Sequence, residues 1–153
     1  MELEELLPHR APMIVLDKLG EFDAENLLAR AAFTVKPSDV FYDENLRGAA
    51  SYFALEYMAQ TMAAYIGALG KMQDPQYRQE VGFVLGTRKL QLNIPAFIEG
   101  KTYVVEAKKA FFDSEMASFD CEIFDDCKNL CARATVNAFK PKDPLKFINQ
   151  DNG

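Results

Sequence analysis

Glu56 is the residue whose surroundings most clearly suggest chemistry. It lies in the stretch AASYFALEYMAQTMAAYIGALG, residues 49–70, and is the only charged residue there. The remaining positions are apolar, small or neutral, a pattern that predicts a buried helix of about six turns. A buried carboxylate is unfavourable unless it is hydrogen-bonded or protonated. Glu56 is therefore either a paired structural group or an acid that faces a cavity.

Three neighbours along the chain could share a site with Glu56. Gln60 lies one helical turn later and could orient the carboxylate or a substrate, although a structural hydrogen bond is its ordinary role. Ser51 lies near the predicted start of the helix. Tyr42 lies in the linker before it, where a packed aromatic is the ordinary interpretation. Its unperturbed pKa of about 10 makes tyrosine a poor base at neutral pH.

His9 and Arg10 lie in a second segment of interest, PHRAPM, residues 8–13. Its two prolines predict a rigid, extended loop, because proline fixes its own φ and disfavours helix at the preceding residue. His9 is the single histidine of the chain. Packing or capping is its ordinary role, and pairing with an acidic neighbour is the ordinary role of Arg10. Both stay candidates for a site.

The cysteines do not suggest a metal centre. Cys121, Cys127 and Cys131 are an odd number crowded near one predicted hairpin, and the chain has one histidine. Zinc sites take four ligands from such groups at regular spacings. We therefore expect reduced structural thiols and no metal.

Bulk properties indicate one soluble, globular domain. The chain has 153 residues, 49% of them hydrophobic, and a formal net charge of -6. This length predicts a single domain over residues 1–153, with a loosely attached polar tail from about residue 141. The negative charge argues against nucleic acid as a partner. The acidic start MELEELL and the lack of a long uncharged apolar run predict no membrane insertion and a cytoplasmic location.

Hydrophobic periodicity predicts the remaining elements. A short helix is expected over Glu2–Leu7, and irregular segments are expected over 36–48, 71–80 and 93–100. Alternating or apolar runs predict strands over Met13–Phe22, Leu27–Val35, Val81–Leu92, Lys101–Phe112, Glu115–Phe124 and Leu130–Phe139. The predicted class is α+β, with a long central helix wrapped by a curved antiparallel β-sheet.

Two stretches together resemble a known family. LLPHRAPMIVLDKL, residues 6–19, resembles the N-terminal signature of bacterial β-hydroxyacyl-[acyl carrier protein] dehydratases, which have the hotdog fold. LEYMAQ, residues 55–60, resembles their central-helix signature, an acidic residue four positions before a glutamine. PHRAPM, EYMAQT and FVLGTRKL together look closest to the dehydratase-like subgroup of aryl-polyene lipid biosynthesis. The resemblance spans Leu6 to Phe139.

The resemblance implies a site at the interface of two hotdog subunits, in a homodimer or a heterodimer. A histidine of one subunit removes the α-proton of a 3-hydroxyacyl thioester, and a carboxyl group on the other subunit's helix, here Glu56, protonates the departing hydroxyl. Backbone N–H groups near the helix start polarise the thioester carbonyl. An acyl carrier protein brings the substrate on its phosphopantetheine, so no separate cofactor is implied. Arg10 could lie at the entrance that the carrier protein uses.

This sequence departs from the family pattern at the histidine. The family has it about fourteen residues before the acid, where this chain has Tyr42, and Ser51 replaces a glycine five residues before Glu56. Three hypotheses follow. The chain is a subunit whose Glu56 meets a partner's histidine; or it is self-sufficient and uses Glu56 with His9 or Tyr42, as a thioesterase for example; or it is a scaffold in which Glu56 is structural.

Overall fold

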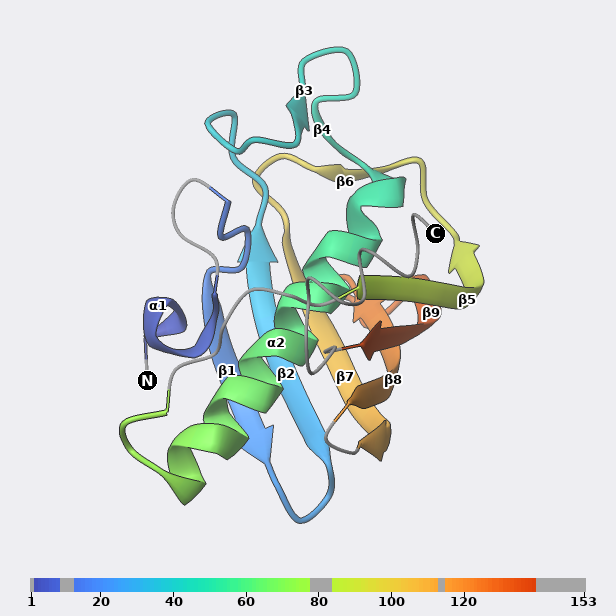
Figure 1. Cartoon of the computed structure of the whole chain (residues 1–153). Coiled ribbons are helices and arrows are strands. Elements are labelled where there is room, and N and C mark those ends of the chain that lie inside the picture. The colour runs from blue at the N-terminus through green and yellow to red at the C-terminus, as the bar shows by residue number, and fades with distance from the viewer. Residues whose placement is uncertain (1, 9–12, 78–83, 113–114, 140–153) are drawn as a thin grey trace, which may run out of the picture.

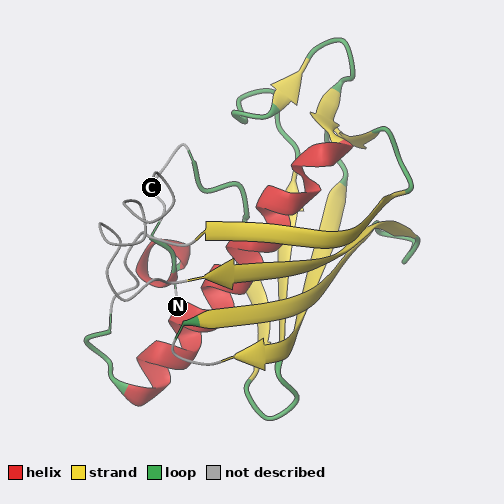
Figure 2. Cartoon of the chain, turned by 45° about the vertical axis from the view of Figure 1, so that its right-hand side comes forward, coloured by secondary structure: helices red, strands yellow, loops and turns green. Residues whose placement is uncertain are grey.

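A long helix lies against the inner face of a curved antiparallel sheet (Figures 1 and 2). The computed structural model describes residues 2–8, 13–77, 84–112 and 115–139. The helical elements are α1 (Leu3–Leu6), a 3₁₀ turn η1 (Ser51–Phe53) and α2 (Ala54–Gln73). The predicted α+β class, with its central helix and wrapped sheet, is confirmed.

The main sheet has six strands in the order β1-β2-β7-β8-β9-β5, so β1 and β5 are its edges. Each neighbouring pair is antiparallel. The strands are β1 (Lys18–Asp23), β2 (Leu28–Thr34), β5 (Val84–Leu92), β7 (Thr102–Phe112), β8 (Met116–Phe124) and β9 (Leu130–Phe139). Alternate residues face the helix; in β8 these are Ala117, Phe119, Cys121 and Ile123, all buried.

A small second sheet lies beyond the start of α2, at the top of Figure 1. It has the order β3-β4-β6. Its strands are β3 (Tyr42–Asp43), β4 (Gly48–Ala50) and β6 (Ala96–Ile98). The two segments that carry β3 and β6 were predicted to be irregular. Their strands are only two and three residues long, too short for an alternating pattern.

The central helix starts later than predicted because residues 48–50 pair with β6 instead. A Cβ on Gly48 would lie 2.9 Å from the carbonyl carbon of Phe97, so glycine permits this close approach. The chain then enters η1 at Ser51 and α2 at Ala54, and the helix continues to Gln73.

Two predicted strands also need correction. The strand predicted from Met13 starts at Lys18, because a side chain of α2 takes backbone groups of Met13 and Val15. Strict alternation over Lys101–Phe112 would place Phe111 on the same face as the buried Ala107 of β7, but Phe111 is 47% exposed. The register shifts between Lys109 and Phe111, and such an irregularity changes the face to which later residues point.

Candidate functional site

Glu56 lies on the wall of a cavity near the start of α2. Its side chain is partly buried, and the cavity of about 150 Å³ is also lined by Leu55, Gly86, Thr87 and Val136. These residues come from the helix, the edge strand β5 and its neighbour β9. The Glu56 side chain is thus not sealed inside its own subunit, and a ligand in this cavity could contact it.

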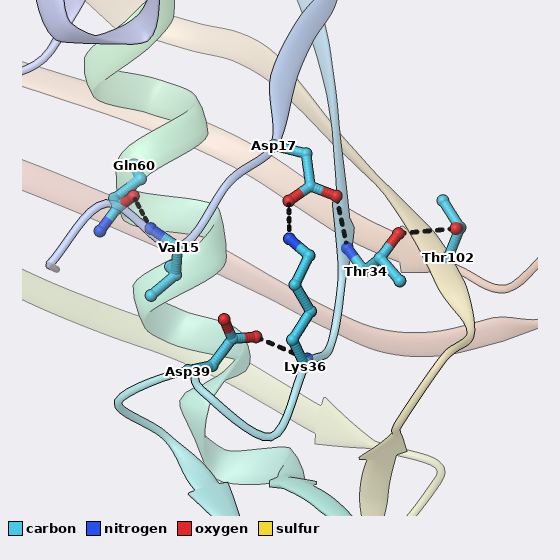
Figure 3. Close-up of polar contacts among 7 residues, drawn as sticks. All are labelled: Val15, Asp17, Thr34, Lys36, Asp39, Gln60 and Thr102. Carbon is cyan, nitrogen blue, oxygen red and sulfur yellow. Dashed lines mark hydrogen bonds and ion pairs between the residues drawn. The ribbon is translucent and has the colours of Figure 1, made fainter. Parts of the chain in front are cut away.

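Gln60 is fully buried one turn after Glu56 and makes three hydrogen bonds. Its Nε2 donates to Oε1 of Glu56 at 3.0 Å and to the carbonyl oxygen of Met13 at 2.7 Å. Its Oε1 accepts from the backbone N–H of Val15 at 3.0 Å, the contact drawn in Figure 3. The structure therefore joins Glu56, Gln60 and the segment before β1, as a carboxylate-orienting role for Gln60 requires.

Ser51 is buried at the start of the helical region, five residues before Glu56. Its backbone N–H donates to the carbonyl oxygen of Pro95 at 3.0 Å, which ties the helix start to the approach of β6. Its carbonyl oxygen in turn accepts from the N–H of Ala54. The contribution of Ser51 to substrate binding stays a prediction.

Tyr42 lies in the small sheet, and its hydroxyl donates to Oε2 of Glu99 at 3.0 Å. Loss of hydration and the nearby Glu99 carboxylate both raise the pKa of Tyr42, which makes its phenol still less suited to act as a base. Its proposed role in substrate binding stays a prediction. His9 and Arg10 fall outside the described residues, so their roles stay predictions too.

An aromatic cluster that the sequence analysis did not identify supports the start of α2. The rings of Phe33 and Tyr57 are stacked with their centres 3.7 Å apart, and Phe97 packs edge-on against both. Phe41 and Phe53 form a second stack at 4.1 Å. Because Tyr57 follows Glu56 directly, the packing of its ring fixes the helical turn that carries the carboxylate. The rings come from separate elements, so no local pattern could have revealed the cluster.

Gly86 and Thr87, which line the cavity, were also not singled out as site residues. Both lie in the FVLGTRKL stretch of the family resemblance, and Gly86 was a further signal, because a glycine within a strand often marks a place where another group comes close. A Cβ at Gly86 would meet no atom within 4 Å, which is consistent with its position beside open space.

One group in the described part of the chain has the spacing of a metal site, Asp125, Asp126 and Cys127 in the β8–β9 turn. The Asp125 carboxylate accepts hydrogen bonds from the backbone N–H groups of Asn129 and Cys127, which lower the pKa of Asp125. These bonds stabilise the turn and account for the arrangement. No described helix has the length and apolar character that crossing a membrane would require.

Comparisons with known proteins agree with this architecture. The dehydratase heterocomplex ApeI:P from Xenorhabdus doucetiae is similar over 100% of this chain and 99% of that chain, with a TM-score of 0.86 and 22% identity. The PaaI protein of the E. coli phenylacetic acid degradation operon is similar over 80% and 82%, with a TM-score of 0.58 and 12% identity. A hypothetical thioesterase from Streptococcus pneumoniae, solved with coenzyme A, is similar over 81% and 85%, with a TM-score of 0.57 and 10% identity.

These likenesses confirm the predicted hotdog fold. The model of the ApeP-like family, described as ApeP dehydratase, matches residues 1–149, nearly the whole chain. The chain belongs to the ApeP-like dehydratase family.

Proposed function

We propose that this chain is a subunit of a 3-hydroxyacyl thioester dehydratase, in which Glu56 is the acid of a site that a partner subunit's histidine completes. The observation that carries the proposal is the partly buried Glu56 side chain, which lines a cavity of about 150 Å³ between the helix and the sheet edge. The membership of the chain in a dehydratase family gives the reaction class.

Dehydration needs one group that accepts a proton and one that donates a proton. The base takes the α-proton, and the electrons of that C–H bond form the new C=C bond. The C–O bond to the hydroxyl breaks, and the hydroxyl leaves as water with a proton from the acid. Glu56 supplies that proton, the partner's histidine receives the α-proton, and the product is a trans-2-enoyl thioester.

The need for a partner follows from the residues of this chain. Its one histidine, His9, lies far along the sequence from Glu56, and Tyr42 occupies the place of the family's histidine. The strand nearest the cavity, β5, is a sheet edge that exposes Leu90 and Leu92. A sheet edge leaves backbone N–H and C=O groups unpaired, and another chain's strand can bind them. That a similar fold was solved as a dehydratase heterocomplex supports a second hotdog subunit as the partner.

The substrate arrives as a thioester on the phosphopantetheine of an acyl carrier protein. The resemblance to the aryl-polyene subgroup supports an acyl chain of aryl-polyene or related fatty-acid type synthesis. Because the phosphopantetheine belongs to the substrate, the reaction needs no separate cofactor. Ser51, Gln60, Tyr42 and Arg10 are the candidates for contacts with the substrate or its carrier.

A thioesterase is the second candidate, because two similar structures are described as thioesterases and one of these was solved with coenzyme A. In that reaction Glu56 would activate a water molecule that attacks the thioester carbonyl. A scaffold that only stabilises an active partner is the third candidate.

Product analysis separates these candidates. The chain is purified alone and together with its hotdog partner, and each sample is given a 3-hydroxyacyl carrier-protein substrate. Enoyl carrier protein formed only by the pair supports the proposal. Free acid and thiol formed by the chain alone would replace it with the thioesterase. Dehydration by the pair that survives Glu56→Gln would reduce the chain to a scaffold.

A further inference from the structure

We propose that the N-terminal arm, residues 2–8 and 13–17, is a positioning element of the site, which acts by holding the Gln60 amide that in turn holds the Glu56 carboxylate. This inference rests on the proposed role of Glu56. It makes Gln60 a positioning residue and gives the segment before β1 a part in function, although that segment lines none of the described cavity.

The hydrogen bonds of Gln60 leave its amide one orientation. A side-chain amide has two N–H donors and one carbonyl acceptor. Both donors are used, on the carbonyl oxygen of Met13 and on Oε1 of Glu56, and the acceptor receives the N–H of Val15. A flipped amide would place its oxygen against two other oxygens and its nitrogen against an N–H group. The backbone of the arm therefore fixes the direction in which the Gln60 N–H group donates to Glu56.

The arm is anchored on both sides of this contact. Leu6 and Leu7 are buried against the small residues of the second half of α2, and the backbone of Leu6 crosses directly over Gly67. At the other end, the N–H of Asp17 donates to the carbonyl oxygen of Ala32 at 2.8 Å.

The side chain of Asp17 strengthens this second anchor. One carboxylate oxygen accepts the backbone N–H of Thr34 and the other pairs with Lys36, as Figure 3 shows. The Gln60 amide thus bonds to a stretch of chain that is held at both ends.

Without the arm, Gln60 would keep only one of its three partners. The side chain is fully buried, so its free N–H and carbonyl groups would turn toward any other partner within reach. The Glu56 carboxylate would then lose a donor of fixed direction. A proton donor must be held close to its productive geometry, so we expect turnover to fall while substrate binding is retained.

Three variants test this coupling in the complex with the hotdog partner. Gln60→Met removes the amide at similar size, and Val15→Pro removes the arm's N–H donor but leaves Gln60 in place. Thr61→Val is the matched control, because Thr61 is equally buried on the same helix and its hydroxyl donates only to the carbonyl oxygen of Tyr57, at 2.8 Å. Dehydration kinetics, their pH profile and amide hydrogen exchange of residues 13–17 are measured for each.

We expect kcat of Gln60→Met to fall about tenfold or more, with KM within about twofold of the parent value. Its pH profile departs from the parent profile, because the hydrogen bond from Gln60 to Glu56 is lost. Amide hydrogen exchange of residues 13–17 becomes faster. Val15→Pro shows a smaller fall in kcat in the same direction. Thr61→Val stays within about twofold of the parent in both kinetic constants and keeps the parent pH profile.

Amide hydrogen exchange of residues 13–17 that stays at the parent rate in Gln60→Met would overturn the inference, regardless of the dehydration rate of that variant. So would a Gln60→Met enzyme with the parent kcat and pH profile, which would make the arm purely structural. If the parent complex itself does not dehydrate the substrate, the proposed function fails and the catalytic part of this inference fails with it. The exchange data then still decide whether Gln60 holds the arm.

Discussion

Replacing Gly67 by alanine should destabilise the protein, although alanine is the better helix former. Gly67 lies in the second half of α2, where the N-terminal arm crosses the helix. A Cβ at this position would lie 2.9 Å from the carbonyl carbon of Leu6 and 3.0 Å from its Cα, and closer still to its carbonyl oxygen. These are backbone atoms, so the arm itself has to move.

The size of the effect follows from two opposing contributions. Alanine gains about 1 kcal/mol of helix propensity over glycine. Overpacking costs about 1–3 kcal/mol when neighbours can shift. Full release of the arm would expose Leu6 and Leu7, which are 0% and 2% exposed, at roughly 1.5–3 kcal/mol for each leucine. We therefore expect Gly67→Ala to lower the free energy of unfolding by up to about 2 kcal/mol if the arm shifts locally, and by about 2–5 kcal/mol if the arm is released.

Gly70→Ala is the matched control, because it lies in the same helix and gains the same propensity. The three atoms nearest to its Cβ would be ring atoms of Tyr77, with Cγ at 2.7 Å, so a side chain and not the backbone has to move. We expect its stability to stay within about 1 kcal/mol of the parent in urea denaturation with equal m-values. A Gly67→Ala protein that is as stable as Gly70→Ala would refute the close packing of the arm.

Three further predictions concern other parts of the chain. In the native protein a thiol reagent should modify Cys127 quickly and the buried Cys121 and Cys131 slowly, with all three reacting in denaturant; equal rates would contradict the burial. Burial raises the pKa of the Cys121 thiol, whereas the thiol of the unfolded chain ionises near its ordinary pKa of 9.0. The free energy of unfolding should therefore fall as pH rises above 9.0. Urea titrations at several pH values should show a weaker decline for Cys121→Ala. A Tyr42→Phe protein loses the hydrogen bond to Glu99 and should keep nearly the parent midpoint in urea denaturation. Its kcat should stay at the parent value, because Tyr42 is neither the proton donor nor the proton acceptor of the proposed reaction. A raised KM would support its candidate role in substrate binding, and a collapse in kcat would make Tyr42 a catalytic residue.

Local patterns predicted the parts of the fold that depend on neighbouring residues. Strict alternation over 115–124 and 130–139 predicted β8 and β9 almost to their ends, because one face of each strand is buried. The run of apolar and small residues around Glu56 predicted α2, because a helix of that composition on nearly all sides is buried. Each of these signals is contained in a single segment.

Features that depend on distant contacts were not predictable in this way. Val15 reads as part of a strand, but its N–H is bound by a side chain 45 residues away, and β1 starts later as a result. The sequence raised two alternatives for Glu56, a sealed structural pair or an acid beside a cavity. The position of β5 determines that Glu56 borders a cavity, because Gly86 and Thr87 also line it. No spacing near Glu56 contains that information. The role of Glu56 as an acid stays a prediction.

The most direct test of the account is the turnover of the complex that carries Glu56→Gln, which keeps the size of the side chain but removes the acid. Single-turnover dehydration of a 3-hydroxyacyl carrier-protein substrate is measured, with Glu106→Gln as the control, since Glu106 is bound to Arg30 in the six-stranded sheet. We predict a fall of about 100-fold or more for Glu56→Gln, with the complex still assembled, and no comparable fall for the control. An assembled Glu56→Gln complex that turns over at the parent rate would contradict the claim that this carboxyl group donates the proton.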